Sequence, residues 1–375
     1  MPLTSPAMRE QFPIARRYAY LDHAAIAPMA VPVQRAIADY MERQQNEPFE
    51  EKGWAALRAD VRSRIAELLG TTPEHITFTR NTTAGLSLVA AGLSFRPGEN
   101  VVSVQGEFPA NVYPWMGLKR KGVELRFYEP TDGRIDVGGL LKMCDSRTRV
   151  VAISWVQFAN GFRSDLVSLG SELRSRETFL VVDAMQAVGH LATDLGRLPV
   201  DLLAAAAPKW MLGPLGIGFA YVSERLFPRL WPPSIGVESV VQDHEYFRYE
   251  LCLKPDARRF EDSGPNLAGL SGLNAAVDLL LQAGPAQIEA RVLQLADSLR
   301  EDLRRRGHRL LLEPAPRERS GIVSFRHRSE PAATVAARLR EAGVITSLRG
   351  DFVRASPHFY NNEDDLGRLL EALPA

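Results

Sequence analysis

The stretch 180-LVVDAMQAVGH-190 stops an apolar run with an aspartate, Asp183, and places a glutamine, Gln186, three residues later. A continuous apolar run is typical of a strand that is buried on both faces of a parallel sheet. A carboxylate at the end of such a strand is costly unless a cation or hydrogen-bond donors face it. Capping of the following turn is one explanation for Asp183, and a positively charged partner is the other.

Six further strand-like runs alternate with helical patterns around this stretch. The expected strands cover residues 75–79, 100–104, 124–128, 149–156, 179–184, 201–207 and 217–222, and typical helices between them cover 54–70 and 83–93. Alternation of this kind predicts an α/β fold in which helices cover both faces of the sheet.

The pattern changes after about residue 232. A turn-rich stretch reaches about residue 266, and beyond it we expect helices at 267–284, 286–307, 331–343 and from Glu363, with strands at 320–327 and around Ile345 and Val353. We therefore expect a large domain at 17–284 and a smaller C-terminal α+β domain at 285–375, with residues 1–16 packed against the smaller domain.

Composition excludes several classes of protein. The chain has 375 residues, with 45 Lys plus Arg and 45 Asp plus Glu, so its formal charge of zero argues against a nucleic-acid or anionic-membrane surface. No run approaches the ~20 apolar residues of a membrane-spanning helix, so we expect no membrane partner. Its two cysteines, Cys144 and Cys252, form no disulfide framework or metal-binding pattern, which favours a cytoplasmic protein without a metal.

Lys209 is the candidate positive partner. In 208-PKWMLGPLGIG-218 it follows an apolar run and precedes a Gly/Pro-rich turn. A desolvated lysine has a lowered pKa and is suited to forming a Schiff base, although a surface lysine is the simpler reading of this residue alone. Together with Asp183 it fits a pyridoxal 5′-phosphate site, where a lysine binds the cofactor and a carboxylate keeps the pyridine nitrogen protonated. Gln186 would then hydrogen-bond the phenolic oxygen of the cofactor.

A phosphate site is predicted at 79-TRNTTAGL-86. A strand is expected to end near Thr79 and a helix to begin near Thr83, so backbone N–H groups and the hydroxyls of Thr82 and Thr83 would face an anion. Ordinary helix capping explains the same residues, so the pattern gains weight only from Asp183 and Lys209.

With these residues in place, the chain resembles the class V aminotransferase family of fold-type I pyridoxal-phosphate enzymes, which includes cysteine desulfurases, kynureninases and isopenicillin N epimerases. The resemblance rests on 20-YLDHAAIAP-28, 78-FTRNTTAGLSLVA-90, 107-EFPANVYPW-115, 156-VQFANGF-162, 182-VDAMQAVGH-190, 209-KWMLGPLGIG-218, 259-RFEDSGPN-266 and 354-RASPHFYN-361. It implies a large domain with a seven-stranded, mostly parallel sheet and a smaller C-terminal domain.

The resemblance also implies roles for single residues. Lys209 becomes the Schiff-base lysine, Asp183 the partner of the pyridine nitrogen, Gln186 the ligand of the ring oxygen, and Thr82 and Thr83 the phosphate ligands.

Three further residues take roles from the resemblance. Phe108 would stack on the cofactor ring, and Arg354 would bind the substrate carboxylate through its planar fork. His23 lies in a segment that the family folds over the mouth of the site, where it contacts substrate or has a purely structural role.

The chain departs from the family pattern at several positions. Ala206, Ala207 and Pro208 replace the serine and histidine that precede the lysine in desulfurases, so the phosphate loses a hydroxyl ligand. The run 263-SGPN-266 replaces a motif whose threonine reaches the phosphate of a neighbouring subunit, and Ser263 or a backbone N–H, as at Gly264, would compensate. The loop 343–358 has no cysteine, so persulfide chemistry is not expected.

We therefore expect a homodimeric enzyme, with active sites at the subunit interface, that acts on the α-carbon of an amino acid. An aminotransferase-type reaction is the family default, and a C–S or C–C lyase and an amino-acid epimerase are the alternatives. A non-enzymatic protein of the same fold would need none of Lys209, Asp183 and Arg354.

Overall fold

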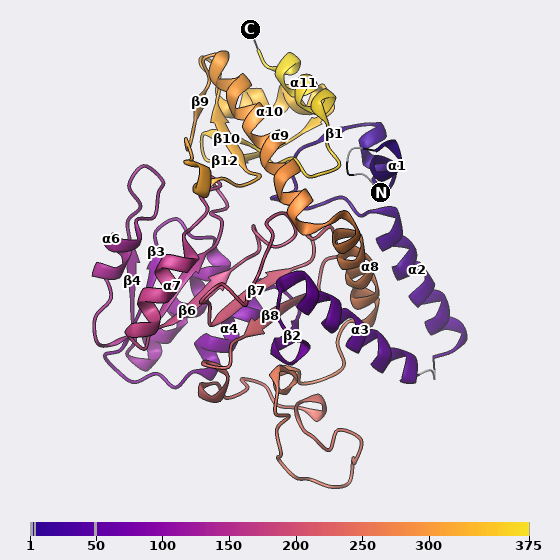
Figure 1. Cartoon of the computed structure of the whole chain (residues 1–375), viewed down its shortest axis with the longest axis vertical. Coiled ribbons are helices and arrows are strands. Elements are labelled where there is room, and N and C mark those ends of the chain that lie inside the picture. The colour runs from indigo at the N-terminus through magenta and orange to yellow at the C-terminus, as the bar shows by residue number, and fades with distance from the viewer. Residues whose placement is uncertain (1–2, 4, 49–50, 375) are drawn as a thin grey trace.

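A seven-stranded sheet forms the centre of the computed structural model of this chain (Figure 1). The structure describes residues 3, 5–48 and 51–374. From one edge to the other, the strands are β2 (Ile76–Thr79), β8 (Gly218–Val222), β7 (Leu202–Ala206), β6 (Phe179–Asp183), β5 (Thr148–Ser154), β3 (Asn100–Val104) and β4 (Glu124–Tyr128). Strand β8 pairs antiparallel with both β2 and β7, and the other pairs in this sheet are parallel. The expected α/β class and the mostly parallel sheet are confirmed.

Side chains of the central strands alternate between two apolar cores. In β6, Leu180 and Val182 pack into one core and Val181 into the other, because successive side chains point to opposite faces of a sheet. Burial on both faces explains why these strands are continuously apolar. The first core is covered by α3 (Glu51–Leu69), α6 (Val137–Lys142), α7 (Leu166–Ser175) and α8 (Leu267–Ala283), and the second by α4 (Thr82–Gly92) and α5 (Tyr113–Met116). Helix α2 (Val31–Asn46) packs on the outer side of α8.

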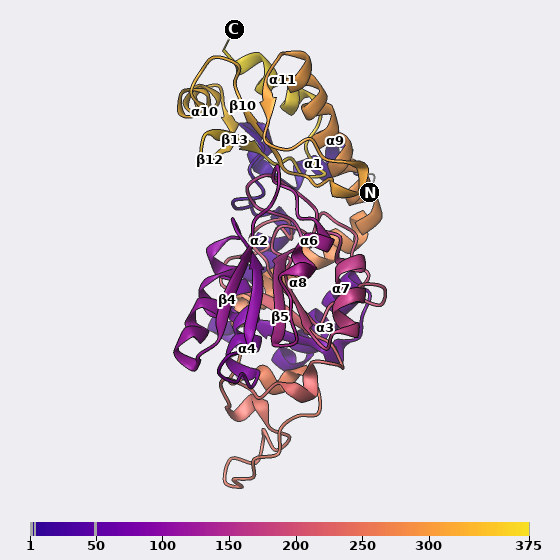
Figure 2. The same cartoon turned by 90° about the vertical axis from the view of Figure 1, so that its left-hand side faces the viewer.

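The C-terminal residues form a smaller sheet with its own core. Its four antiparallel strands lie in the order β12 (Ser347–Arg349), β13 (Phe352–Ala355), β10 (Val323–Arg326) and β9 (Arg309–Leu310). Helices α10 (Ala332–Glu341) and α11 (Glu363–Ala372) contribute apolar side chains to this core. Figure 2 shows this part of the chain at one end of the molecule, beyond the central sheet.

A long helix, α9 (Pro285–Arg305), connects the two parts. Its first turns place Ile288 and Val292 in the core of the large sheet, whereas Leu299 and Leu303 lie in the C-terminal core. Among the described residues no single helix is long and apolar enough to cross a membrane. Helices α8 and α9 reach that length and apolar composition only when they are taken together, and the chain bends by 80° at their junction.

The N-terminal residues pack with the C-terminal part of the chain, and Ala19 and Leu21 lie in its core. Strand β1 (Ala19–Tyr20) pairs in parallel with β11 (Val344–Ile345), although residues 19–22 were expected in the large domain. Helix α1 (Pro6–Glu10) carries Arg9, which forms an ion pair of 2.8 Å with Asp365. This ion pair joins the described part of residues 1–16 to α11; residues 1, 2 and 4 lie outside the described residues, and the domain bounds stay a prediction.

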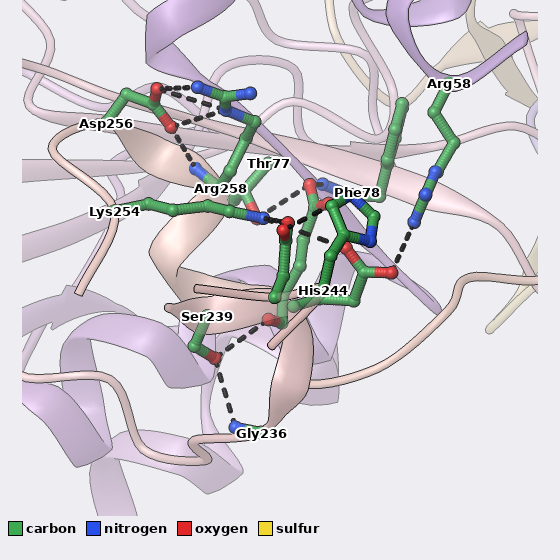
Figure 3. Close-up of polar contacts among 12 residues, drawn as sticks. Arg58, Thr77, Phe78, Gly236, Ser239, His244, Lys254, Asp256 and Arg258 are labelled. Carbon is green, nitrogen blue, oxygen red and sulfur yellow. Dashed lines mark hydrogen bonds and ion pairs between the residues drawn. The ribbon is translucent and has the colours of Figure 1, made fainter. Parts of the chain in front are cut away.

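A long loop projects from the far end of the large sheet, between β8 and α8. It is the salmon loop at the bottom of Figure 1, and its two sides meet at a β-bridge between Val240 and Leu253. A network of ion pairs holds its base, where the Lys254 ammonium lies 2.8 Å from the Asp243 carboxylate and Arg58 lies 2.6 Å from Glu238 (Figure 3). The base is therefore fixed to α3, while the tip of the loop extends into solvent.

Candidate active site

The carboxyl ends of the central strands and the N-terminus of α4 meet at a cavity of about 260 Å³. Ligand sites in open α/β sheets lie at this edge, because the strand ends and the helix N-termini converge there. The side chains that line the cavity include Thr82, Phe108, Ser154, Asp183, Gln186 and Lys209. Residues that are far apart in the sequence are thus brought to one place.

Lys209 lies three residues beyond the end of β7, in the turn that leads to β8. Burial lowers the pKa of its ammonium group to about 8, and the nearby Asp183 carboxylate opposes this shift. The Lys209 Nζ atom lies 5.4 Å from the centre of the Phe108 ring. A buried lysine with a lowered pKa has a larger fraction of neutral, nucleophilic amine near neutral pH.

Asp183 is the last residue of β6 and is 4% exposed. Its Oδ1 atom accepts a hydrogen bond of 2.9 Å from the Met185 N–H, so the capping contact is present. Burial nevertheless raises the pKa of the carboxyl to about 6, and this hydrogen bond and Lys209 only partly oppose the shift. The Met185 N–H and Lys209 therefore do not offset the full cost of burying this carboxylate, which fits a further cationic partner in the cavity.

The predicted phosphate ligands lie at the first turn of α4. Asn81 caps the helix by accepting a hydrogen bond of 2.9 Å from the Ala84 N–H, and the helix begins at Thr82, one residue earlier than expected. Thr82 is buried and donates to the Met185 sulfur at 3.3 Å, whereas Thr83 is exposed. Both threonines line the cavity, with the backbone N–H groups of a helix N-terminus beside them.

Gln186 lines the cavity with its amide held from behind. Its Nε2 donates to the Ala24 carbonyl at 2.9 Å, and its Oε1 accepts from the Trp210 indole at 2.8 Å. An amide nitrogen carries two hydrogens, so one N–H of Gln186 is left for a ring oxygen.

Two aromatic rings form one wall of the cavity. Phe108 and Phe158 meet edge to face with their centroids 5.3 Å apart. Phe108 was expected from the sequence, whereas Phe158 was not singled out, although it lies in the segment 156-VQFANGF-162 that carries the resemblance.

Arg354 is fully buried one layer behind this wall. Its Nη1 donates to the Phe158 carbonyl at 2.8 Å, its Nη2 lies 3.4 Å from the Asp22 carboxylate, and its Nε is buried without a hydrogen-bond partner in the structure. Arg354 is not one of the side chains that line the cavity, but its charge is close enough to help lower the pKa of Lys209. The guanidinium is thus near the site but is not open to it.

Arg349 is a cationic residue that the sequence reasoning missed. It lies on β12, and its guanidinium carbon stands 6.0 Å from the centre of the Phe158 ring. Its charge also helps lower the pKa of Lys209. The signal available in the sequence was a second arginine in 347-SLRGDFVRASPH-358.

His23 does not lie at the mouth of the cavity. It is fully buried, with Nδ1 2.9 Å from the Ser356 carbonyl and Nε2 2.8 Å from the Tyr360 hydroxyl. Both ring nitrogens have partners within the protein and His23 is not among the residues that line the cavity, which favours the structural role of the two that were expected.

Gly264 lines a second cavity, of about 610 Å³, and not the cavity of Lys209. The two cavities share Arg80, Asn81, Thr83 and Gly216 along their boundary. Ser263 and Gly264 thus lie near the N-terminus of α4 within their own chain. Within the described part of the chain, no group of three or more His, Cys, Asp or Glu side chains could hold a metal ion.

A sequence model of the family described as aminotransferase class-V matches residues 19–369. The chain belongs to the class V aminotransferase family. A probable cysteine desulfurase of Methanothermobacter thermautotrophicus is 28% identical, over 98% of this chain and 96% of that protein. The isopenicillin N epimerase of Streptomyces clavuligerus is 30% identical, over 85% of this chain and 84% of that protein.

The same family appears among solved structures. A cysteine desulfurase from Thermococcus onnurineus NA1 superimposes with a TM-score of 0.87 at 26% identity, over 97% of this chain and 95% of that one. The fold is therefore that of the fold-type I enzymes, and class V aminotransferases and their structural neighbours carry pyridoxal 5′-phosphate.

Proposed function

We propose that this chain is a pyridoxal-phosphate enzyme that acts at the α-carbon of an amino acid. The single observation that carries the proposal is that a lysine with a lowered pKa and a buried carboxylate with a raised pKa share one cavity. Each group is costly to bury alone, and the cofactor supplies the aldehyde and the ring nitrogen that match them.

The residues around the cavity fit this cofactor. Lys209 would form the covalent link, Asp183 would hold a proton on the ring nitrogen, and the remaining N–H of Gln186 would reach the ring oxygen. Thr82, Thr83 and the first N–H groups of α4 would hold the phosphate. When bound, the cofactor withdraws electrons from the substrate α-carbon.

The chain's own residues would then bind the substrate and move its proton. The amine of Lys209, once free, stands where it can take or return the α-proton. Arg354 or the more exposed Arg349 would bind the substrate carboxylate, because a planar guanidinium pairs with both oxygens. A small shift of the Phe158 backbone would free Nη1 of Arg354 for this contact.

Within this chemistry an aminotransferase-type reaction is the first candidate, as the default of the family. A lyase or an epimerase reaction is the second, because the relatives include proteins named cysteine desulfurase and isopenicillin N epimerase. Neither Cys144 nor Cys252 lines the cavity of Lys209, which argues against a persulfide formed on this chain.

The cofactor test uses purified protein incubated with pyridoxal phosphate. We expect an absorbance band near ~420 nm, the usual signature of the cofactor linked to a lysine. The Lys209→Ala variant should lack this band, and Lys142→Ala, a change at an exposed lysine on α6, should keep it. A wild-type protein that takes up no cofactor, or a Lys209→Ala variant of full activity, contradicts the proposal.

A substrate screen in deuterated water separates the reactions. Transamination predicts a keto acid together with conversion of the cofactor to its amine form, and epimerisation predicts α-deuteration without keto acid. Release of pyruvate or alanine without an amino acceptor indicates a lyase. If no amino acid exchanges its α-proton, the proposed reaction class is wrong.

We also propose a homodimer with the active sites near the interface. Support comes from the tip of the projecting loop, where Phe247 is 95% exposed and Tyr249 is 91% exposed. Apolar side chains gathered on one surface segment are typical of a protein–protein contact. The fixed base of the loop would present this tip to a second copy without a large loss of conformational freedom.

A further inference from the structure

Glu107 is a buried carboxylate directly behind the wall of the Lys209 cavity, and it is 6% exposed. Its Oε1 accepts from the Ser154 backbone N–H and from Gln157 Nε2, both at 2.7 Å. Its Oε2 accepts from Asn111 Nδ2 at 3.2 Å and is hydrogen-bonded to the Ser154 hydroxyl. Each oxygen of the carboxylate therefore has two partners, which fixes its orientation.

Ser154, which is hydrogen-bonded to Glu107, and Phe108, its neighbour in the chain, form part of the cavity wall. Ser154 is the last residue of β5 and pairs in register with Asp183 on β6, and both line the cavity. Phe108, which follows Glu107 in the chain, stands beside Lys209. A shift of the Glu107 carboxylate would therefore displace Ser154 and Phe108, which both line the pocket, at the same time.

Glu107 is also coupled to the site through charge. Burial raises the pKa of Glu107 to about 7, its hydrogen bonds to Ser154 and Gln157 oppose the shift, and the charge of Asp183 raises it further. Asp183 in turn faces Lys209. Glu107, which follows β3, is thus coupled to Asp183 at the end of β6, and Asp183 to Lys209 beyond the end of β7.

We propose that Glu107 is a positioning residue of this pocket: it holds Ser154 and Phe108 in place, and its carboxylate, when ionised, acts on Asp183 from behind. The inference rests on the proposed function, since the pocket is taken to hold the cofactor. A negative charge behind Asp183 favours a proton on any base that Asp183 holds.

Two variants separate the charge from the packing. Glu107→Gln keeps the shape of the side chain and an oxygen for the Ser154 N–H, but removes the charge. Glu107→Ala removes every hydrogen bond of this group. The matched control is Glu129→Gln, which removes the charge of an exposed glutamate beyond β4.

The readouts are the dissociation constant of pyridoxal phosphate, the pH midpoint of the cofactor absorbance band and the melting temperature of the cofactor-free protein. We expect Glu107→Gln to bind the cofactor, with a pH midpoint lower than that of wild type by about 0.5–1 unit, because a negative charge has been removed. Glu107→Ala should bind at least about tenfold more weakly, because the wall loses its support. Glu129→Gln should match wild type in all three readouts.

A Glu107→Gln variant with the wild-type pH midpoint overturns the inference, even if its melting temperature falls. The reason is that loss of a purely structural glutamate would change the melting temperature and leave the pH midpoint unchanged. This result is informative even if Glu107→Ala does not fold. A wild-type protein that binds no cofactor overturns the proposed function and, with it, this inference; a wild-type protein that binds, with variants identical to it, overturns the inference alone.

Discussion

At the scale of single residues, the site depends on two buried groups whose environments favour their neutral forms. Burial lowers the pKa of Lys209 and raises that of Asp183, and their mutual attraction only partly offsets both shifts. Such pairs are found at sites where a ligand completes the charge balance. Both residues could be picked out from the sequence, but their burial and their neighbours could not.

The first prediction concerns the pH dependence of Lys209. Only the neutral amine attacks an aldehyde, and the pKa of this lysine is lowered to about 8. The rate constant for linkage to pyridoxal phosphate should therefore rise with pH and level off above about 8. Stopped-flow absorbance measures it, and a rate that keeps rising to pH ~10, near the ordinary lysine pKa, would show that the amine is not desolvated.

The second prediction concerns Asp183→Asn. Since the folded-state pKa of Asp183, about 6, is above its ordinary value of 3.8, the folded state binds this proton more tightly than the unfolded state. The protonated carboxyl of Asp183 should therefore stabilise the folded, cofactor-free protein below pH ~4. This stabilisation should be lost as the pH rises to about 6. At pH 8 the asparagine variant should be more stable than wild type by up to about 3 kcal/mol, while most catalysis is lost.

Urea denaturation of the cofactor-free protein at pH 4 and pH 8 measures this effect. Asp136→Asn is the control, because Asp136 caps α6 at an exposed position where asparagine is an equally good cap. An Asp183→Asn variant with unimpaired activity would falsify the proposed role and leave Asp183 as a turn cap.

At the scale of elements, the position of α4 depends on its close approach to β7. Gly85 faces Ala204, and a Cβ atom at Gly85 would lie 2.7 Å from the Ala204 Cβ atom. The helix can therefore rest on the sheet only because position 85 has no side chain. This contact sets the distance between the sheet and the N-terminus of the helix, where Thr82 and Thr83 form part of the proposed phosphate site.

The third prediction is that Gly85→Ala displaces this helix. Overpacking of this kind costs about 1–3 kcal/mol, and the affinity for pyridoxal phosphate should fall together with the stability. The control is Gly117→Ala, where an added Cβ meets no atom within 4 Å. Loss of stability with unchanged cofactor affinity would show that α4 does not position the phosphate.

At the scale of the whole molecule, the N-terminal residues and α9 join the large and C-terminal parts of the chain, and the projecting loop is proposed to join two copies. Ala19 and Leu21 lie in the C-terminal core, where β1 and β11 form a separate two-stranded sheet, and α9 enters both cores. The site therefore lies where the large sheet meets residues that the C-terminal sheet carries, including Arg349 and Arg354.

The fourth prediction tests the proposed dimer. Phe247→Asp places a charge at the tip of the projecting loop and should convert the dimer to a monomer, because a buried unpaired charge is costly at an interface. Sedimentation velocity measures the change. The control is Val167→Asp, an exposed apolar position on α7, where an acidic residue suits the helix N-terminus. A wild-type protein that sediments as a monomer, or a dimer unaffected by Phe247→Asp, contradicts the proposal.

The sequence by itself determined the strands of the large sheet, several of the helices and six of the residues that line the cavity, because continuous apolar runs, helix caps and short motifs are local signals. Lys209, Asp183, Gln186, Thr82 and Thr83 could be named in this way and Phe108 from the family resemblance, and the structure brings all six to one cavity. Tertiary structure alone decided that His23 is buried against Ser356 and Tyr360, that Arg354 lies behind Phe158, and that Glu107 supports Ser154. These contacts join residues from distant parts of the chain, and burial and hydrogen-bond partners depend on what packs around a side chain rather than on its sequence neighbours.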